Sequence, residues 1–226
     1  MTLPDFPQVD LFAAAVNALN GVLVARNKSH NRGFTFAGLM ILAYFGGIGG
    51  GVSRDVLLNQ IPAPLQGVKY PAVCFLMGLL GLGIYRFAAS REEHFRTRML
   101  AFFKTFSLPW FAILGAHKSL DAGLGVVPAI LIGLIATTAG GVLIDLFCGV
   151  TPELVMPNQQ IVSTAILAGG IYSLIAVHES SGESKFPVTL IAFGVSFIFR
   201  FLAVREHWAS IVPHNPPNCQ VSSPDA

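Results

Sequence analysis

Charged residues are scarce in this sequence. Only 12% of its 226 residues are Asp, Glu, Lys or Arg, about half the share found in an average soluble domain. The mean hydropathy is +0.64. A soluble domain of this size has to cover its surface with charge, so the composition excludes a disordered chain and most ordinary soluble enzymes. It favours a protein whose solvent is the lipid bilayer.

Other absences exclude further classes. The three cysteines are too few and too scattered for a disulfide scaffold or a zinc cluster. The six histidines show no i, i+4 pairing. The motifs GxxxxGKS/T, HExxH, GxSxG and CxxC are missing, so we expect neither an enzyme nor a cofactor. Basic residues are not interleaved with aromatic ones, which argues against a nucleic-acid partner.

The sequence contains long stretches without charged residues. Arg32 and Arg54 bracket 21 residues without a formal charge, and Asp121 and Asp145 bracket 23. A membrane-spanning helix needs about 20 apolar residues. The N-terminus lacks the basic region of a signal peptide, so the first apolar stretch is expected to stay as a helix. Charges, prolines and loop residues predict seven spans, at residues 7–26, 34–58, 69–87, 105–121, 125–148, 158–178 and 187–205.

The segments between these spans predict an orientation. Ten Lys and Arg residues collect on one side, and only Lys69 and Lys185 on the other. Because basic loops stay in the cytoplasm, we expect the N-terminus outside and the C-terminus inside, in the cell (inner) membrane of a prokaryote. The charged segment 91–107 is expected to be a cytoplasmic, partly amphipathic connector. Residues 1–206 then form a single membrane domain, and residues 207–226 form a disordered cytoplasmic tail.

A glycine motif occurs twice. Residues 50–55 read GGVSRD and residues 140–145 read GGVLID, with Pro62 and Pro152 following at the same offset of 90 residues. Spans one to three (about 7–88) and four to six (about 105–178) therefore look like two copies of one unit, with the seventh helix (about 187–205) left over. Three is an odd number, so the second copy enters the membrane from the opposite side, as an inverted repeat.

Glycine in the middle of a span has two interpretations. It costs about 1 kcal/mol relative to Ala in a helix interior, so residues 46–51 and 140–141 are expected to kink or break spans two and five. Broken helices at matching positions of two repeats indicate a transport site. The alternative is close helix packing, because Gly46/Gly50 and Gly47/Gly51 are also GxxxG pairs.

The stretch GGGVSRDVLLNQIP and its copy TAGGVLIDLFCGVTP resemble the duplicated motif of the TRIC (trimeric intracellular cation) channels, prokaryotic branch. The seven-span layout is similar too, over residues 7–205. The resemblance implies a homotrimer with a pore in each protomer that passes monovalent cations such as K⁺, and a gating role for Lys118. Close relatives that share the motif have also been regarded as small-solute or amino-acid transporters. Ile144 departs from the motif, since many bacterial relatives carry arginine there.

Ionisable groups inside spans are functional candidates because they are costly there. Arg54 and Asp55 point about 100° apart on a helix, so each is expected to seek a partner elsewhere. Asp145 either pairs with Arg54 across the repeat axis or stands unpaired and attracts cations. Lys118 either faces the pathway, with Asp55 or Asp145 offsetting its charge, or extends to the headgroups. The complete set of pore or gating candidates is Lys118, Arg54, Asp55, Asp145, Gly49, Gly50, Gly51, Gly140, Gly141, Asn17, Asn20 and Thr138, with Thr137 beside it.

Together these observations predict an all-α integral membrane protein with two inverted three-helix repeats and one extra helix. The expected function is a K⁺ or Na⁺ channel, homotrimeric and surrounded by membrane lipids. Two alternatives remain. The first is a secondary transporter for a small amino acid such as glycine, whose carboxylate would bind the N–H groups at the helix breaks with help from Arg54. The second is a membrane scaffold that transports nothing.

Overall fold

The computed structural model describes residues 6–26, 33–88, 93–156, 160–178, 186–206 and 208. Within these residues all regular secondary structure is helical. There are two short 3₁₀ turns, η2 (Ala63–Leu65) and η3 (Glu153–Val155). The long helices are α1 (Phe6–Ala25), α2 (Phe36–Leu57), α3 (Lys69–Ala88), α4 (Glu93–Asp121), α5 (Val126–Cys148), α6 (Ile161–His178) and α7 (Phe186–Arg205).

The helices coincide with the predicted spans. By length and composition, six of them are able to cross a membrane. The exception is α4, which carries more charge and begins at Glu93 instead of at the predicted residue 105. The expected connector is therefore largely part of this helix, which is a correction to the predicted boundary. The predicted tail lies outside the described residues, except for Trp208.

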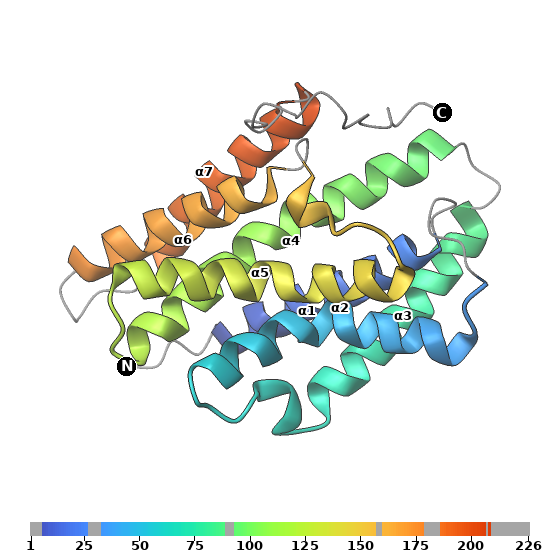
Figure 1. The fold of residues 1–226 in the computed structure, drawn as a ribbon, viewed down its shortest axis with the longest axis horizontal. Coiled ribbons are helices and arrows are strands. Elements are labelled where there is room, and N and C mark those ends of the chain that lie inside the picture. Colours follow the sequence, from blue (N-terminus) through green and yellow to red (C-terminus); the bar gives the residue numbers. More distant parts are fainter. Residues whose placement is uncertain are drawn as a thin grey trace, which may run out of the picture.

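Figure 1 shows α2 and α5 lying side by side through the middle of the molecule, with α3 on the side of α2 and with α6 and α7 on the side of α5. Two larger apolar clusters and a smaller one, in which Ala13 packs with Phe111 and Leu114, hold the described residues in this arrangement. One larger cluster is formed mainly by α1 and α2, with Cys74, Ile144 and Cys148, and the second by α4, α5, α6 and α7. Most core residues of the second cluster are small, which brings the helix backbones close together.

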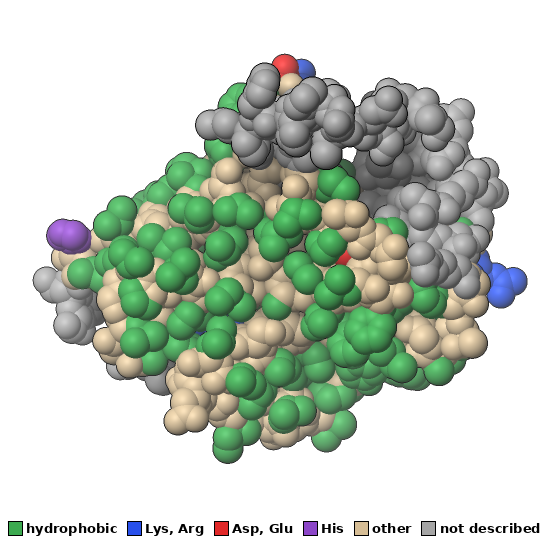
Figure 2. Space-filling view, viewed as in Figure 1, with side chains coloured by type: hydrophobic (Ala, Val, Ile, Leu, Met, Phe, Trp, Pro, Cys, Tyr) green, Lys and Arg blue, Asp and Glu red, His purple; other side chains and the backbone are tan. Residues whose placement is uncertain are grey.

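The outer surface is apolar as well. Figure 2 shows hydrophobic side chains over much of the described surface, with the visible charged side chains mainly at its margins. Leu76, Leu131, Leu174 and Ile198 are each more than half exposed. A soluble monomer rarely exposes contiguous apolar patches of this kind, whereas a surface in contact with lipid tails does so by necessity. The exposed apolar side chains on the outer surface thus agree with the assignment of these helices to a membrane.

Neither α2 nor α5 is interrupted. Both are assigned as continuous α-helices through their glycines, so the predicted break that would free backbone N–H groups is not present. The glycines allow close approach of the two backbones. A Cβ at Gly50 would overlap the carbonyl oxygen of Ala136, and a Cβ at Gly140 would lie 3.0 Å from the carbonyl oxygen of Gly46. Since residue 46 opposes 140 and residue 50 opposes 136, α2 and α5 cross in antiparallel directions.

Candidate functional site

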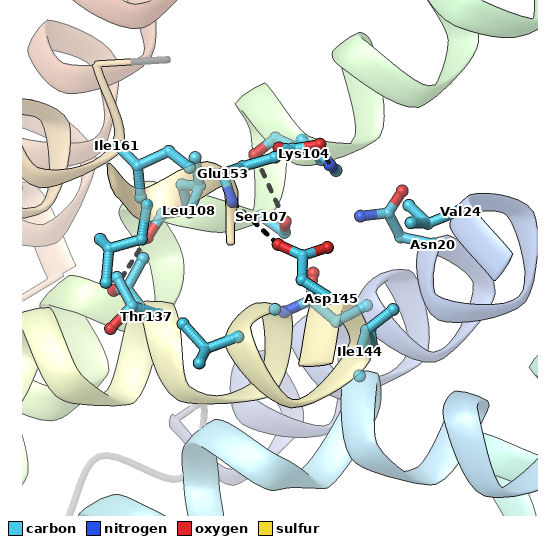
Figure 3. A pocket seen from close by; sticks show the side chains of 16 residues that line it. Asn20, Val24, Lys104, Ser107, Leu108, Thr137, Ile144, Asp145, Glu153 and Ile161 are labelled. Atoms are coloured by element: carbon cyan, nitrogen blue, oxygen red, sulfur yellow. Dashed lines mark hydrogen bonds and ion pairs between the residues drawn. The ribbon is translucent and has the colours of Figure 1, made fainter. Parts of the chain in front are cut away.

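A polar cavity lies on one side of the α2–α5 crossing (Figure 3). Its empty volume is about 630 Å³, part of it open to solvent. It is lined by α1, α2, α4, α5, η3 and the start of α6, and its polar side chains are Asn17, Asn20, Lys104, Ser107, Thr137, Thr138, Asp145 and Glu153. Five of the predicted candidates therefore meet around one space: Asn17, Asn20, Thr138, Gly141 and Asp145.

The polar groups of the cavity present mostly oxygen atoms. The hydroxyls of Thr137 and Thr138 donate to carbonyls of their own helix, at 2.8 and 2.9 Å, so their lone pairs remain directed outward. The Oδ1 atom of Asn20 is buried and accepts no hydrogen bond from the described residues. Figure 3 shows Asn20 and Asp145 pointing into the same space. Carboxylate, amide and hydroxyl oxygens favour a cation over an anion.

Asp145 also has a structural role. Its Oδ2 accepts a hydrogen bond from the backbone N–H of Glu153 at 2.9 Å. In the first half of the chain, Asp55 Oδ2 accepts one from Ala63 at the same distance. Between the accepting aspartate and the donating N–H, the chain turns through a positive φ, at Gly149 (68°) and at Asn59 (54°). The sequence repeat is therefore also a repeat of local structure, with an aspartate that fixes the turn after the helix.

An ion pair borders the cavity. Lys104 Nζ binds Glu153 Oε1, and the two side chains are 23% and 28% exposed. Because the N–H of the same Glu153 binds Asp145, η3 connects the border of the cavity to the carboxylate inside it. Sequence reasoning missed both Lys104 and Glu153, since each falls in a segment that was expected to be a connector or loop.

A buried charge cluster lies on the other side of the crossing. Arg54 is fully buried and binds Asp10 with both terminal nitrogens, at 3.4 and 3.3 Å. Tyr70 donates to the same carboxylate at 2.9 Å. Arg54 Nε also donates to Asp55 Oδ1 at 2.8 Å, and Lys118 Nζ lies 2.9 Å from that same oxygen. The cluster thus connects α1, α2, α3 and α4.

The structure corrects one expectation about these charges. Arg54 and Asp55 were expected to bind partners elsewhere instead of each other, but they do pair, because the long guanidinium stem covers the 100° between adjacent helix positions. Each also has the expected partner elsewhere, Asp10 for Arg54 and Lys118 for Asp55. Between the two alternatives for Asp145, pairing with Arg54 is not the one observed, since the other nitrogens of Arg54 bind Asp10.

Asp10 and Tyr70 were not among the candidates. Asp10 was detectable, because it is an ionisable residue within the first predicted span, the criterion that selected Lys118. Of the two acids considered as partners of Lys118, Asp55 is the one that it contacts.

The glycine candidates divide into two groups. Gly49, Gly50 and Gly140 lie in the crossing, where an added Cβ would meet backbone atoms of the opposite helix. Gly51 faces the Arg54 guanidinium, 3.7 Å from the position of a Cβ, and Gly141 faces open space in the wall of the cavity. Close packing therefore explains the first group, whereas Gly51 and Gly141 leave room beside polar sites.

Comparison with known proteins gives the family. The sequence family described as "Glycine transporter" matches residues 8–86 and 101–177, which is more than half of the chain. The chain belongs to this family. A relative of the glycine transporter family is the UPF0126 membrane protein of Deinococcus radiodurans, 28% identical over 87% of this chain and 88% of that protein. Another is the UPF0126 inner membrane protein YadS of Escherichia coli K12, which is 26% identical over 88% of this chain and 91% of that protein.

Solved structures place this glycine transporter family member in the TRIC fold, which confirms the resemblance seen in the sequence. The TRIC trimeric intracellular cation channel orthologue from Rhodobacter sphaeroides is 25% identical, with a TM-score of 0.73 over 90% of this chain and 97% of that one. A prokaryotic TRIC channel is 22% identical in sequence, with a TM-score of 0.77 over 89% of this chain and 96% of that one. The chain is therefore an all-helical, multi-pass membrane protein.

Proposed function

We propose that the chain is a channel for monovalent cations, with K⁺ as the expected ion and one pathway in each protomer. The observation that carries the proposal is the position of the polar groups relative to the α2–α5 crossing. A cavity that carries Asp145 and several amide and hydroxyl groups among apolar side chains lies on one side, and a charge cluster lies on the other. The likeness to the Rhodobacter cation channel supports the same function.

The proposed architecture is a single membrane domain, residues 1–206, built from inverted repeats at about 7–88 and 105–178 with a seventh helix at 187–205. The reciprocal contacts of Gly50 with Ala136 and of Gly140 with Gly46 support a two-fold relation between the halves. In this arrangement α4 also crosses the membrane, with Lys104 and Lys118 paired to acids of other elements, and α2 and α5 bend at their glycines during opening. We propose a homotrimer by analogy with the Rhodobacter relative, which is a trimeric channel.

The proposed orientation has the N-terminus outside and the C-terminus, including the predicted tail, in the cytoplasm. The cavity then opens toward the cytoplasm, because it lies at the C-terminal end of α5 and the N-terminal end of α4. Asp145 attracts cations into it, and Asn17, Asn20 and Thr138 replace part of their water shell. The glycine crossing is the narrow part of the pathway, and Lys118 with Asp55 closes its outer end.

Single-channel recording tests this proposal. Purified protein in a planar bilayer with asymmetric KCl is expected to give unitary steps whose reversal potential follows the K⁺ gradient. Asp145→Asn keeps an oxygen that can accept from the Glu153 N–H but removes the charge. We expect it to lower the unitary conductance about two- to fivefold at low salt, because the carboxylate no longer concentrates cations, and by less at about 1 M KCl, where charge is screened.

Asp121→Asn is the matched control for this variant. It removes one carboxylate from the opposite end of the bundle, where the Asp121 side chain is 52% exposed and pairs with His117. Its conductance should equal that of the wild type. An equal loss in both variants would contradict a specific role of Asp145, and a bilayer without unitary steps would contradict the channel.

A second candidate function is supported by the description of the family as glycine transporters. The binding groups expected from the sequence, free N–H groups at helix breaks and Arg54, do not serve here, because α2 is continuous and Arg54 is bound to Asp10. The cavity carries Lys104 and Asp145, charges that match the carboxylate and the ammonium of an amino acid. Binding the carboxylate would require Lys104 to leave Glu153, with which it pairs. Saturable glycine uptake into liposomes without unitary currents would support the transporter, and absence of both activities a scaffold.

A further inference from the structure

The outer charge cluster is neutral only because of Lys118. Asp10 and Asp55 carry two negative charges, and Arg54 compensates one of them. Lys118 compensates the other through its contact with Asp55 Oδ1. If the Lys118 ammonium moved away, the remaining three groups would carry a net charge of −1 in a largely buried place. Such a charge requires a compensating cation.

The two cations of the cluster are held very differently. Arg54 is 0% exposed and is bound by two carboxylates. The Lys118 side chain is 29% exposed and contacts one oxygen at the end of a flexible four-carbon stem. Asp55 stays in position without the lysine, because Arg54 Nε and the backbone N–H of Ala63 still bind it, at 2.8 and 2.9 Å. Lys118 is therefore the removable member of the cluster.

The place beside Asp145 that corresponds to the site of Lys118 beside Asp55 has no lysine. Aligning Gly21 with Gly115 places Val24 of α1 at the position that corresponds to Lys118 of α4. Val24 and Asp145 both line the open cavity. Beside Asp145 there is therefore a cavity that admits solvent, whereas beside Asp55 there is the ammonium group of Lys118.

We propose that the Lys118 ammonium occupies a binding site for a monovalent cation on Asp55, and that K⁺, Rb⁺ or ammonium ion replaces it when the side chain moves away. A primary ammonium group has the charge of these ions and nearly their size, so the carboxylate that holds one can hold the others. Lys118 then acts as a tethered competitor of the permeant ion. This inference rests on the proposed conduction of cations, but binding is measurable without it.

Thermal unfolding of full-length Lys118→Met tests the proposal. Methionine keeps the length of the stem and leaves the position of the ammonium empty. We expect KCl, RbCl or NH₄Cl to raise Tm by about 3–6 °C at ten times the dissociation constant, relative to N-methylglucamine chloride at equal ionic strength. In Lys118→Met/Asp55→Asn the cation-specific rise should disappear. A rise of equal size in both variants, or in neither, would overturn the proposal.

Lys69→Met is the control for net charge. Lys69 is exposed at the start of α3, on the same side of the molecule as Lys118. Its removal changes the charge of the protein by the same amount without touching Asp55. We expect Lys69→Met to show no cation-specific rise beyond that of the wild type. A rise as large as that of Lys118→Met would mean that cations bind non-specifically.

The wild-type protein provides a second test that does not depend on a variant that folds. K⁺ that displaces Lys118 from Asp55 makes its amine more reactive toward an amine-labelling reagent. Labelling of Lys118, measured by peptide mass spectrometry relative to Lys69, is expected to accelerate in KCl compared with N-methylglucamine chloride. Equal rates in the two salts would contradict displacement. Cation-specific stabilisation of Lys118→Met without K⁺ currents would support this inference and reject the channel. K⁺ currents without cation-specific stabilisation would support the channel and reject this inference.

Discussion

Arg54 connects the groups of the buried charge cluster. It is fully buried, and its guanidinium is shared between Asp10 and Asp55. A charge in this position is tolerated only when its partners are held in place, because the desolvation of each ion is unfavourable. Tyr70 contributes by fixing Asp10 with a hydrogen bond of 2.9 Å. The cluster is thus a positioning device for Asp55, the carboxylate that meets Lys118.

Asp10→Asn tests how strongly Arg54 depends on its bidentate partner. Breaking a buried pair from one side costs about 3–5 kcal/mol, and we expect the lower part of this range because Asp55 remains bound. Equilibrium unfolding of the purified protein in detergent measures the loss of stability.

The double variant Asp10→Asn/Arg54→Gln separates a buried unpaired charge from a simple loss of contacts. The double variant leaves neither the Arg54 charge nor the Asp10 charge buried without its partner. It should therefore lose less stability than the sum of the losses in Asp10→Asn and Arg54→Gln. Strict additivity would show that Asp10 and Arg54 do not act on each other.

Among the helices, the crossing of α2 and α5 is the most constrained contact. Glycine is required there because the backbone of one helix occupies the space of a side chain on the other. The same helices contain glycines with free space, so one sequence feature serves two purposes. Neighbouring positions therefore differ sharply in what they tolerate.

The pairs Gly50→Ala with Gly51→Ala, and Gly140→Ala with Gly141→Ala, test this difference. At Gly50 and Gly140 the new methyl group meets backbone carbonyls, so the helices must separate, and we expect a loss of several kcal/mol or no folded protein. At Gly141 the space is open, and at Gly51 the methyl group would make an ordinary van der Waals contact with the Arg54 guanidinium. At both positions alanine is expected to be neutral or to stabilise by up to about 1 kcal/mol. Detergent-solubilised yield and unfolding midpoints measure both.

Gly141→Ala has a second expected effect. Its methyl group enters the wall of the cavity, so the variant should fold and yet change the unitary conductance. Folding of Gly140→Ala with the stability of the wild type would contradict the packing explanation.

On the scale of the whole molecule, the two halves are related by more than sequence. Each ends its second helix with an aspartate that binds a backbone N–H eight residues later. The halves differ in charge, since one has Arg54 and Lys118 around its aspartate and the other has Ile144 and Val24. In the proposed pathway, the end at Asp145 attracts cations and the end at Asp55 is already occupied by the Lys118 ammonium.

Cysteine labelling tests the inverted arrangement. Gly67 and Met156 lie in the turns after η2 and η3, and both are exposed. If the repeat is inverted, these two turns, which correspond to each other in the two halves, face opposite sides of the membrane. In a background without the natural cysteines, Gly67→Cys should react with an impermeant maleimide in intact cells, and Met156→Cys only after permeabilisation. Labelling of both from the same side would contradict the inverted repeat and the proposed orientation.

The positions of the helices and the repeat were predictable from sequence alone. Uncharged stretches of sufficient length predict membrane helices because every backbone hydrogen bond is then made within the segment, so distant residues are not needed. The duplicated motif predicted the repeat, and the same rule about ionisable groups that selected Lys118 applies to Asp10. Family resemblance required no geometry beyond the motif and the spacing of the spans.

Tertiary structure decided the partners. Arg54 meets Asp10 across 44 residues and Lys118 meets Asp55 across 63, while the cavity collects side chains from α1 to α6. The role of each glycine also depended on tertiary structure. A glycine in α2 or α5 allows close helix packing only where the backbone of the other helix lies opposite it. These contacts depend on how each helix is rotated about its axis and at what height it crosses its neighbour. Rotation and height are determined by the packing of all the helices together, and the pattern within one helix does not contain them.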